Sequence, residues 1–257
     1  MPLYTTDALI LRTYKLGETD RIVVFLTRDR GKKRGVAKGA RRSRSRFGAA
    51  LEPLTRGRVA YFEKERRELV SLNYVEAERS PMQAPDGDAL GHVGYFAELI
   101  DEWAPEGDPN ERLFRLGASV VDALVLGVPI GPLARYFEYW LLRLQGVYPS
   151  HVACGRCGAD FVSQPQPGAC LQPGERVFTC WSCARGGSGT GAVRGGPLSL
   201  DALRFLDEAA ATGPDRLGGV PFPARAAREL EAVHRALIAT HLEKELKSAR
   251  VLREMQP

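Results

Sequence analysis

Two cysteine pairs with the same internal spacing are the residues of this sequence best suited to metal chemistry. Cys154 and Cys157 form one C-x-x-C motif, Cys180 and Cys183 form a second, and residues 158–179 lie between them. Each motif lets two thiolates turn toward one cation, so together they can complete a tetrahedral site of four sulfur ligands. Four protein ligands leave no position for water, which predicts a structural zinc ion (Zn²⁺). A redox pair, or reduced buried cysteines, are the alternatives.

The fifth cysteine, Cys170, belongs to neither pair and is interpreted as a spare thiol in a loop. The N-terminus lacks the charged and apolar regions of a signal peptide, so a cytoplasmic protein is expected. A reducing cytosol argues against a disulfide framework and favours metal ligation. His241 and Glu243 spell an H-x-E motif, but no cysteine follows it, which argues against a zinc deaminase.

Positive charge is concentrated in one segment, residues 28–46 (RDRGKKRGVAKGARRSRSR). It holds ten cationic side chains against one acid, a net charge of +9, whereas the whole chain carries only +5. Such a segment is typical of a protein that binds a polyanion. The alternative is a solvated loop, although self-repulsion makes that arrangement costly without a partner. The candidate phosphate contacts are Arg28, Lys32, Lys33, Arg34, Lys38, Arg41, Arg42, Arg44 and Arg46.

Aromatic side chains near this segment could stack on bases, as they do in barrels that hold single strands. For each of them, burial in a barrel core is the more ordinary interpretation. The candidates are Tyr14, Phe25, Phe47, Tyr61 and Phe62.

The elements that must position these groups fall into a β part followed by a helical part, a multidomain α+β fold. Short apolar runs separated by glycines predict five strands within residues 1–80. This number suits a small closed barrel, with an OB-fold favoured and an SH3-like barrel as the alternative. The expected strands are residues 7–14, 20–27, 35–38, 57–63 and 68–75.

Beyond a linker at residues 80–87 the apolar spacing becomes helical. Helices are expected at residues 88–103, 110–126, 132–145, 201–211 (with Ser199 as N-cap) and 224–253. The cysteines lie in an aperiodic stretch whose residues 186–196 are expected to form a mobile loop. The resulting organisation is an OB-fold domain (1–80), a helical domain in two parts (81–149 and 198–257) and an inserted zinc element (150–197).

Motifs for catalysis are missing from the sequence: it has no phosphate-binding loop and no nucleophile elbow. A non-catalytic protein is therefore expected. The most apolar run, residues 118–130, is too short to cross a bilayer, so no membrane association is expected. Besides DNA binding, two functions stay open: a zinc-ribbon factor acting on RNA or the transcription machinery, and a metal-dependent nuclease. The acids that a nuclease could use, among them Asp86, Asp88, Glu98, Asp101 and Glu102, are better explained as a solvated surface.

At this point the sequence resembles a known family, the bacterial DNA repair proteins RecO, most closely its Deinococcus-type members. The resemblance covers nearly the whole chain and is most specific in the first 55 residues. The matching stretches, besides the cysteine pairs, are residues 8–20 (ALILRTYKLGETD), 26–31 (LTRDRG), 37–42 (AKGARR), 51–53 (LEP) and 242–248 (LEKELKS).

This resemblance implies an N-terminal OB-fold and a helical domain that carries a zinc element. It also implies binding to single- and double-stranded DNA and annealing of complementary strands. Partners implied in the same way are RecR, often RecF, and single-strand binding protein, which RecA replaces on gapped DNA; RecA is thus an indirect partner. The expected location is the cytoplasm, in association with the nucleoid.

Overall fold

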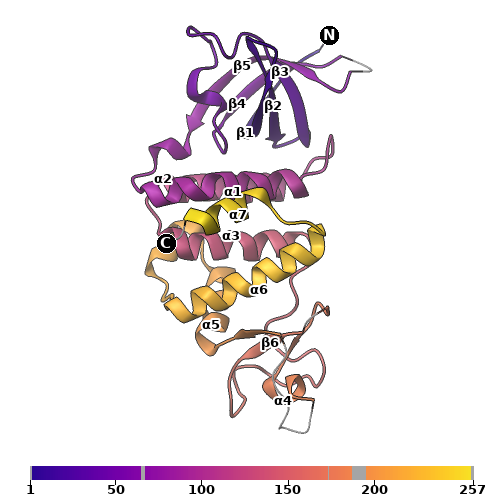
Figure 1. Cartoon of the computed structure of the whole chain (residues 1–257), viewed down its shortest axis with the longest axis vertical. Coiled ribbons are helices and arrows are strands. Elements are labelled where there is room, and N and C mark those ends of the chain that lie inside the picture. Colours follow the sequence, from indigo (N-terminus) through magenta and orange to yellow (C-terminus); the bar gives the residue numbers. More distant parts are fainter. Residues whose placement is uncertain (1, 65–66, 173, 187–194, 256–257) are drawn as a thin grey trace. The chain divides into compact units, whose positions relative to one another are not determined.

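A computed structural model describes residues 2–64, 67–172, 174–186 and 195–255 of the chain (Figure 1). The chain forms two compact units. Unit 1 comprises Met1–Ile130 together with Leu246–Pro257, and unit 2 comprises Gly131–Glu245. This division differs from the four ranges expected from the sequence, because the barrel and the first helices share unit 1. The loop expected at residues 186–196 lies largely outside the described residues.

Unit 1 begins with a closed five-stranded barrel in the order β1-β2-β3-β5-β4. Neighbouring strands are antiparallel except β3 and β5, which are parallel and close the barrel. This topology confirms the predicted OB-fold. The strands are β1 (Leu3–Leu16), β2 (Asp20–Thr27), β3 (Lys32–Ala37), β4 (Arg56–Phe62) and β5 (Val70–Arg79).

Strand β1 is longer than the expected residues 7–14 because it serves both sides of the barrel. Its first half, Leu3 to Leu9, pairs with β4, and the stretch from Ala8 to Leu16 pairs with β2. An irregularity between Ile10 and Arg12 bends the strand between these two partners. The alternation of the strands then directs one set of side chains inward, among them Ile10, Val23, Phe25, Tyr61 and Leu72.

Helices α1 (Gly87–Trp103), α2 (Glu111–Val125) and α7 (Lys247–Met255) complete unit 1. Asp86 caps α1 by accepting from the Asp88 N–H at 3.0 Å, and Asn110 caps α2 by accepting from Leu113 N–H at 3.1 Å. Short 3-10 helices lie at Gly48–Leu51 and Pro81–Gln83. Among the described residues, no helix combines the length and the apolar character that crossing a bilayer needs.

Unit 2 consists of helices around a small three-stranded sheet in the order β7-β6-β8. The Ser199 side chain accepts from the Ala202 N–H, which confirms Ser199 as the N-cap of α5. The elements are α3 (Ile130–Leu144), β6 (Ala169–Leu171), β7 (Phe178–Thr179), α4 (Trp181–Ala184), β8 (Gly196–Leu198), α5 (Leu200–Ala211), a 3-10 helix (Pro214–Gly219) and α6 (Ala224–Leu242).

The single helix expected over residues 224–253 is wrong. Helix α6 ends at Leu242, where Glu243 takes a left-handed conformation with φ of 54°, and α7 starts separately at Lys247. The apolar spacing continues across this break, through Leu242 and Leu246, so periodicity alone could not locate it. What fixes the start of α7 is a tertiary contact, because Glu98 of α1 accepts from the backbone N–H of Ser248 at 2.7 Å.

Candidate functional site

The four paired cysteines lie together in unit 2. The sulfur atoms of Cys154, Cys157, Cys180 and Cys183 all lie within 4.8 Å of one another, and the Cys157 and Cys180 sulfurs are 3.8 Å apart. Cys170 is not part of this group: it is buried in β6, so its assignment to a loop is wrong. The two motifs therefore form a four-thiol cluster close enough to hold one metal ion.

Tight backbone turns bring the first pair to the cluster. The Gly158 N–H donates to the Cys154 carbonyl at 2.8 Å, and Gly158 adopts a φ of 74° that favours glycine. Gly155 is equally constrained, because a Cβ there would lie 2.9 Å from a methyl group of Val177. The second pair is placed by α4, which Cys180 precedes as N-cap residue.

Backbone dipoles favour the ionised form of one sulfur. Burial raises the pKa of the Cys154 thiol, but hydrogen bonds from the backbone of Cys157, Cys180 and Arg156 outweigh burial and bring the pKa down to about 6. Because the thiolate is the form that binds metal, Cys154 is prepared for a cation. Burial and the neighbouring sulfurs instead raise the pKa of Cys183 to about 12.

Three of the nine predicted phosphate contacts are already paired with carboxylates. Arg28 Nη2 lies 2.8 Å from Glu111 Oε1, and Lys33 Nζ lies 2.8 Å from Glu63 Oε1. Lys32 Nζ lies 3.2 Å from Asp101 Oδ1 and also donates to the Asp101 carbonyl. The Lys32 and Lys33 side chains are only 13% and 17% exposed. Their geometry is that of structural ion pairs within unit 1.

The other six predicted contacts are exposed, and within the described chain none of them pairs with a carboxylate at 4.0 Å or less. Their cations point to solvent from β3 and from residues 38–46, the start of the connection between β3 and β4. They are Arg34, Lys38, Arg41, Arg42, Arg44 and Arg46.

Two of these six also anchor the connection to the barrel. Arg41 Nη1 donates to the carbonyls of Gly17 and Glu18 at 3.0 and 2.9 Å, in the turn between β1 and β2. Arg46 Nη2 donates to the carbonyl of Leu72 in β5 at 3.5 Å. The connection is thus held against the scaffold, and its cations are presented at a defined place.

The five aromatic candidates separate by position. Phe25, Phe47 and Tyr61 lie in the barrel core, where no base can reach them. Tyr14 is 43% exposed and Phe62 is partly exposed. These two lie on one registered row across the outer surface of the barrel, which runs Tyr14, Ile22, Val36, Ser71 and Phe62. The row therefore has one accessible ring at each end, with two aliphatic side chains and the Ser71 hydroxyl between them.

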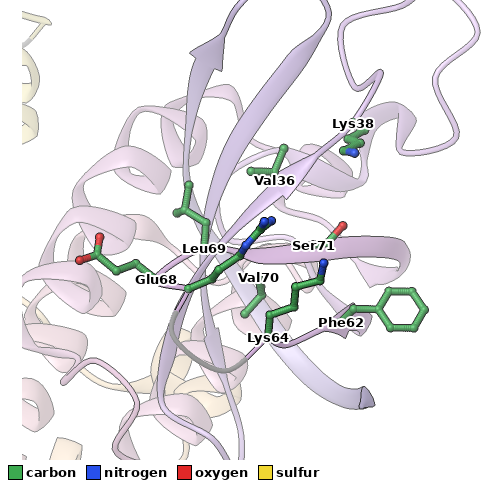
Figure 2. A pocket seen from close by; sticks show the side chains of 9 residues that line it. Val36, Lys38, Phe62, Lys64, Glu68, Leu69, Val70 and Ser71 are labelled. Atoms are coloured by element: carbon green, nitrogen blue, oxygen red, sulfur yellow. The ribbon is translucent and has the colours of Figure 1, made fainter. Parts of the chain in front are cut away.

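An open groove of about 530 Å³ adjoins the Phe62 end of this row (Figure 2). Sequence reasoning missed Lys64, Arg67 and Leu69 in this groove, because they lie outside the basic segment. The signal that could have found them is the group of three cations in the expected turn between strands 57–63 and 68–75, where residues 64–67 read KERR. The lining residues are Val36, Lys38, Phe62, Lys64, Arg67, Glu68, Leu69, Val70 and Ser71.

The fold and these sites define an OB-fold protein that also carries a helical unit and a four-cysteine group. Models of known protein families match the chain over almost its entire length. Residues 1–81 match the model described as "Recombination protein O N terminal", and residues 84–250 match "Recombination protein O C terminal". The chain belongs to the RecO family of DNA repair proteins.

Relatives from several bacteria carry the name DNA repair protein RecO. The chain is 35% identical over 254 residues to the protein of Koribacter versatilis, covering 97% of this chain and 98% of that one. It is 36% identical over 252 residues to the protein of Geobacter sulfurreducens, covering 98% of each. The protein of Anaeromyxobacter sp. (strain K) is also 36% identical over 252 residues, covering 97% of this chain and 95% of that one.

Proposed function

We propose that this protein is a DNA-binding recombination mediator that anneals complementary strands and, with RecR, helps to load RecA onto gapped single-stranded DNA. The observation that supports this proposal best is the group of six exposed cations on residues 34–46, none of them paired with a carboxylate of the described chain. Phosphate groups are the partners that such a surface lacks.

The DNA contacts that we propose are Arg34, Lys38, Arg41, Arg42, Arg44 and Arg46. Arg28, Lys32 and Lys33 contribute to the scaffold instead, because Glu111, Asp101 and Glu63 already neutralise them. In OB-folds the face of strands 2 and 3 and the loops after strands 1 and 4 hold oligonucleotides. The registered row from Tyr14 to Phe62 crosses that face, and Arg41 is attached to the first of those loops.

Annealing requires no covalent chemistry, so we propose that the protein is not an enzyme. Two complementary strands repel each other through their phosphates. A surface that neutralises part of this charge brings the strands together and leaves recognition to base pairing. Single- and double-stranded DNA are both ligands of such a surface, since the phosphate contacts carry no sequence information.

For the four-thiol cluster we propose a structural zinc ion held by Cys154, Cys157, Cys180 and Cys183. Zinc–sulfur bonds of about 2.3 Å in a tetrahedron place the sulfurs about 3.8 Å apart. The Cys157–Cys180 separation of 3.8 Å fits this edge length. When bound, the ion would cross-link the turn at Gly158 to helix α4.

Two protein partners belong to the proposal, RecR and single-strand binding protein, with RecA as an indirect partner. The cytoplasmic location near the nucleoid stays a prediction that follows from DNA binding.

A strand-annealing assay tests the function. Complementary oligonucleotides are coated with single-strand binding protein, and duplex formation is followed by fluorescence with and without this protein. Faster annealing of the coated strands is expected. A protein that binds RNA in preference to DNA and leaves the annealing rate unchanged would instead point to the transcription-associated alternative, and magnesium-dependent cleavage would point to a nuclease.

A further inference from the structure

The groove beside Phe62 exists because the barrel closes over a very short distance. Strands β3 and β5 are joined by two registered pairs only, Gly35 with Val70 and Val36 with Ser71. Gly35 permits this approach, because a Cβ there would lie 2.0 Å from Leu72 Cδ1. Strand β3 ends one residue later, so the described residues that line the outer surface beyond the seam are Lys38 and, from the β4–β5 connection, Lys64 and Arg67 to Leu69.

The groove has the size and the lining of a site for a flat, partly apolar anion. Its volume of about 530 Å³ falls within the range of small-ligand pockets, about 300–1,000 Å³. The apolar part of the lining consists of Val36, Leu69 and the Phe62 ring, and the Leu69 side chain is 36% exposed to solvent.

Its charged groups are mostly cationic and lie around the apolar part. Among the lining residues that the structure describes, Lys38, Lys64 and Arg67 stand against one acid, Glu68. Figure 2 shows the Glu68 carboxylate directed away from Lys64 and Phe62. A ligand that combines an aromatic ring with a phosphate would satisfy both parts of the lining.

We infer that this groove holds one unpaired nucleotide of a DNA single strand, with its base against the Phe62 ring and its phosphate near Lys38 and Lys64. This inference rests on the proposed DNA binding and adds a selectivity for unpaired DNA to it. A base inside a duplex is stacked on both faces, so it can enter the groove only after it has left its pair and its neighbours. The cations of residues 41–46 face no such restriction, since phosphates are exposed in both forms of DNA.

The positions of the groove and of Arg34 also define a path for the DNA single strand across the barrel. Arg34 and Val36 are two residues apart in β3, so their side chains lie on the same face of the barrel. A DNA single strand with one base in the groove can therefore place its next phosphates near Arg34. Groove and cationic surface thereby form consecutive parts of one path.

The experiment compares the affinities of the full-length protein for a single-stranded oligonucleotide and for the duplex of the same sequence. Phe62→Ala is expected to lower the preference for single strands over duplex by about 5- to 150-fold, the range expected for losing one stacked base. Phe62→Tyr keeps a ring and should restore the preference. Tyr74→Ala, an exposed aromatic of β5 that does not line the groove, is the matched control.

A second variant and a spectroscopic signal test the same inference in case Phe62→Ala impairs folding. Lys64→Ala combined with Arg67→Ala leaves the apolar lining intact and should lower the same preference. With 2-aminopurine in the single strand, the fluorescence quenched by wild-type protein should recover with Phe62→Ala. An unchanged preference in folded Phe62→Ala protein overturns the inference while DNA binding stands. Wild-type protein that binds neither form of DNA overturns the proposed function as well.

Discussion

Glu98 of α1 accepts hydrogen bonds from the first residues of α7: the Ser248 N–H lies 2.7 Å from Oε2, and the Lys247 N–H lies 3.3 Å from Oε1. The Ser248 hydroxyl donates to the same carboxylate. Arg12 of β1 completes the contact, with Nη2 at 3.3 Å from Oε1. One side chain thus joins the barrel, the first helix and the last helix of unit 1.

Replacing Glu98 with Gln should therefore loosen α7. The amide keeps an acceptor but loses the charge that faces the helix N-terminus and Arg12, at an expected cost of about 1–2 kcal/mol in unfolding free energy. Hydrogen exchange of the α7 amides should speed up more than that of the β2 amides. Equal exchange in both elements would show that Glu98 does not hold the helix.

Acid should have the same effect on the wild-type protein. Burial raises the Glu98 pKa, but the hydrogen bonds from Ser248 and the charge of Arg12 outweigh burial, so the folded pKa lies below the ordinary value of 4.5. A lowered pKa stabilises the folded state above 4.5, and this contribution is lost as the pH falls through the folded pKa. Protection of α7 should decline in that window, and the decline should be weaker in Glu98→Gln.

Removing exposed cations should weaken DNA binding and its salt dependence together. In the described part of the chain, the side chains of Arg34, Arg42 and Arg44 form no hydrogen bond or ion pair with the scaffold, so their triple replacement by alanine should leave thermal stability nearly unchanged. If each neutralises one phosphate, the slope of log K against log salt should become less steep by about 2.7 on duplex DNA. Fluorescence anisotropy between low and moderate salt measures this slope.

A control variant with the same charge change separates local contacts from net charge. Arg204, Arg228 and Arg235 are exposed on α5 and α6 in unit 2, and their joint replacement by alanine removes three charges elsewhere. If both triple variants reduce affinity equally, the effect comes from the overall charge and not from the barrel surface.

The proposed zinc ion should be stoichiometric and structural. Wild-type protein should contain about one equivalent of zinc by elemental analysis, and Cys154→Ser with Cys157→Ser should lose it. Losing a structural metal should reduce the stability of unit 2 by about 3 kcal/mol or more. Cys170→Ala should keep the metal, because Cys170 lies outside the cluster. Wild-type protein with little bound metal after purification without chelators would contradict the assignment.

A buried polar chain should make unit 2 sensitive to mild acid. His234 is fully buried, lies 2.9 Å from Glu138 Oε2 through Nδ1, and lies 3.1 Å from the Tyr148 hydroxyl through Nε2. Burial lowers its pKa below 6.5, although Glu138 acts in the opposite direction. The folded state therefore prefers neutral His234, and stability is lost as the pH falls below 6.5, by at most about 1.4 kcal/mol per pH unit for one proton.

Urea unfolding between pH 5 and 8 measures this loss. His234→Gln should be less stable at pH 8, because two buried groups lose their partner, but its stability should change less with pH. His241→Gln, on the same helix, should keep the wild-type pH dependence. A wild-type stability that is flat below pH 6.5 would show that protonation of His234 is not linked to folding.

Local patterns in the sequence were sufficient to predict the barrel and the four-cysteine cluster. Strand alternation and glycine turns act over a few residues, so β2 was predicted with its observed bounds. The cysteine spacing expresses a geometric requirement of the metal, which explains why Cys154 and Cys183 could be assigned together. The N-cap at Ser199 is likewise a local hydrogen bond.

Contacts between residues far apart in the sequence determined the features that local sequence patterns could not predict. Lys32 and Arg34 are equivalent in the sequence, but only Lys32 meets a carboxylate, Asp101, which comes from a helix far along the chain. Lys64 was not predicted as a site residue, because only the folded barrel shows that it lines the groove beside the β3–β5 seam. The separate start of α7 at Lys247 depends on Glu98 in the same way.

The return of the chain after Glu245 has a consequence for synthesis. Residues 246–255 belong to unit 1 but are translated after the whole of unit 2. On the ribosome, the barrel and α1 can form early, whereas the carboxylate of Glu98 must wait for Ser248 to emerge. A nonsense mutation anywhere in unit 2 would therefore leave the amino-terminal unit unfinished too, even though every residue of its barrel had been made.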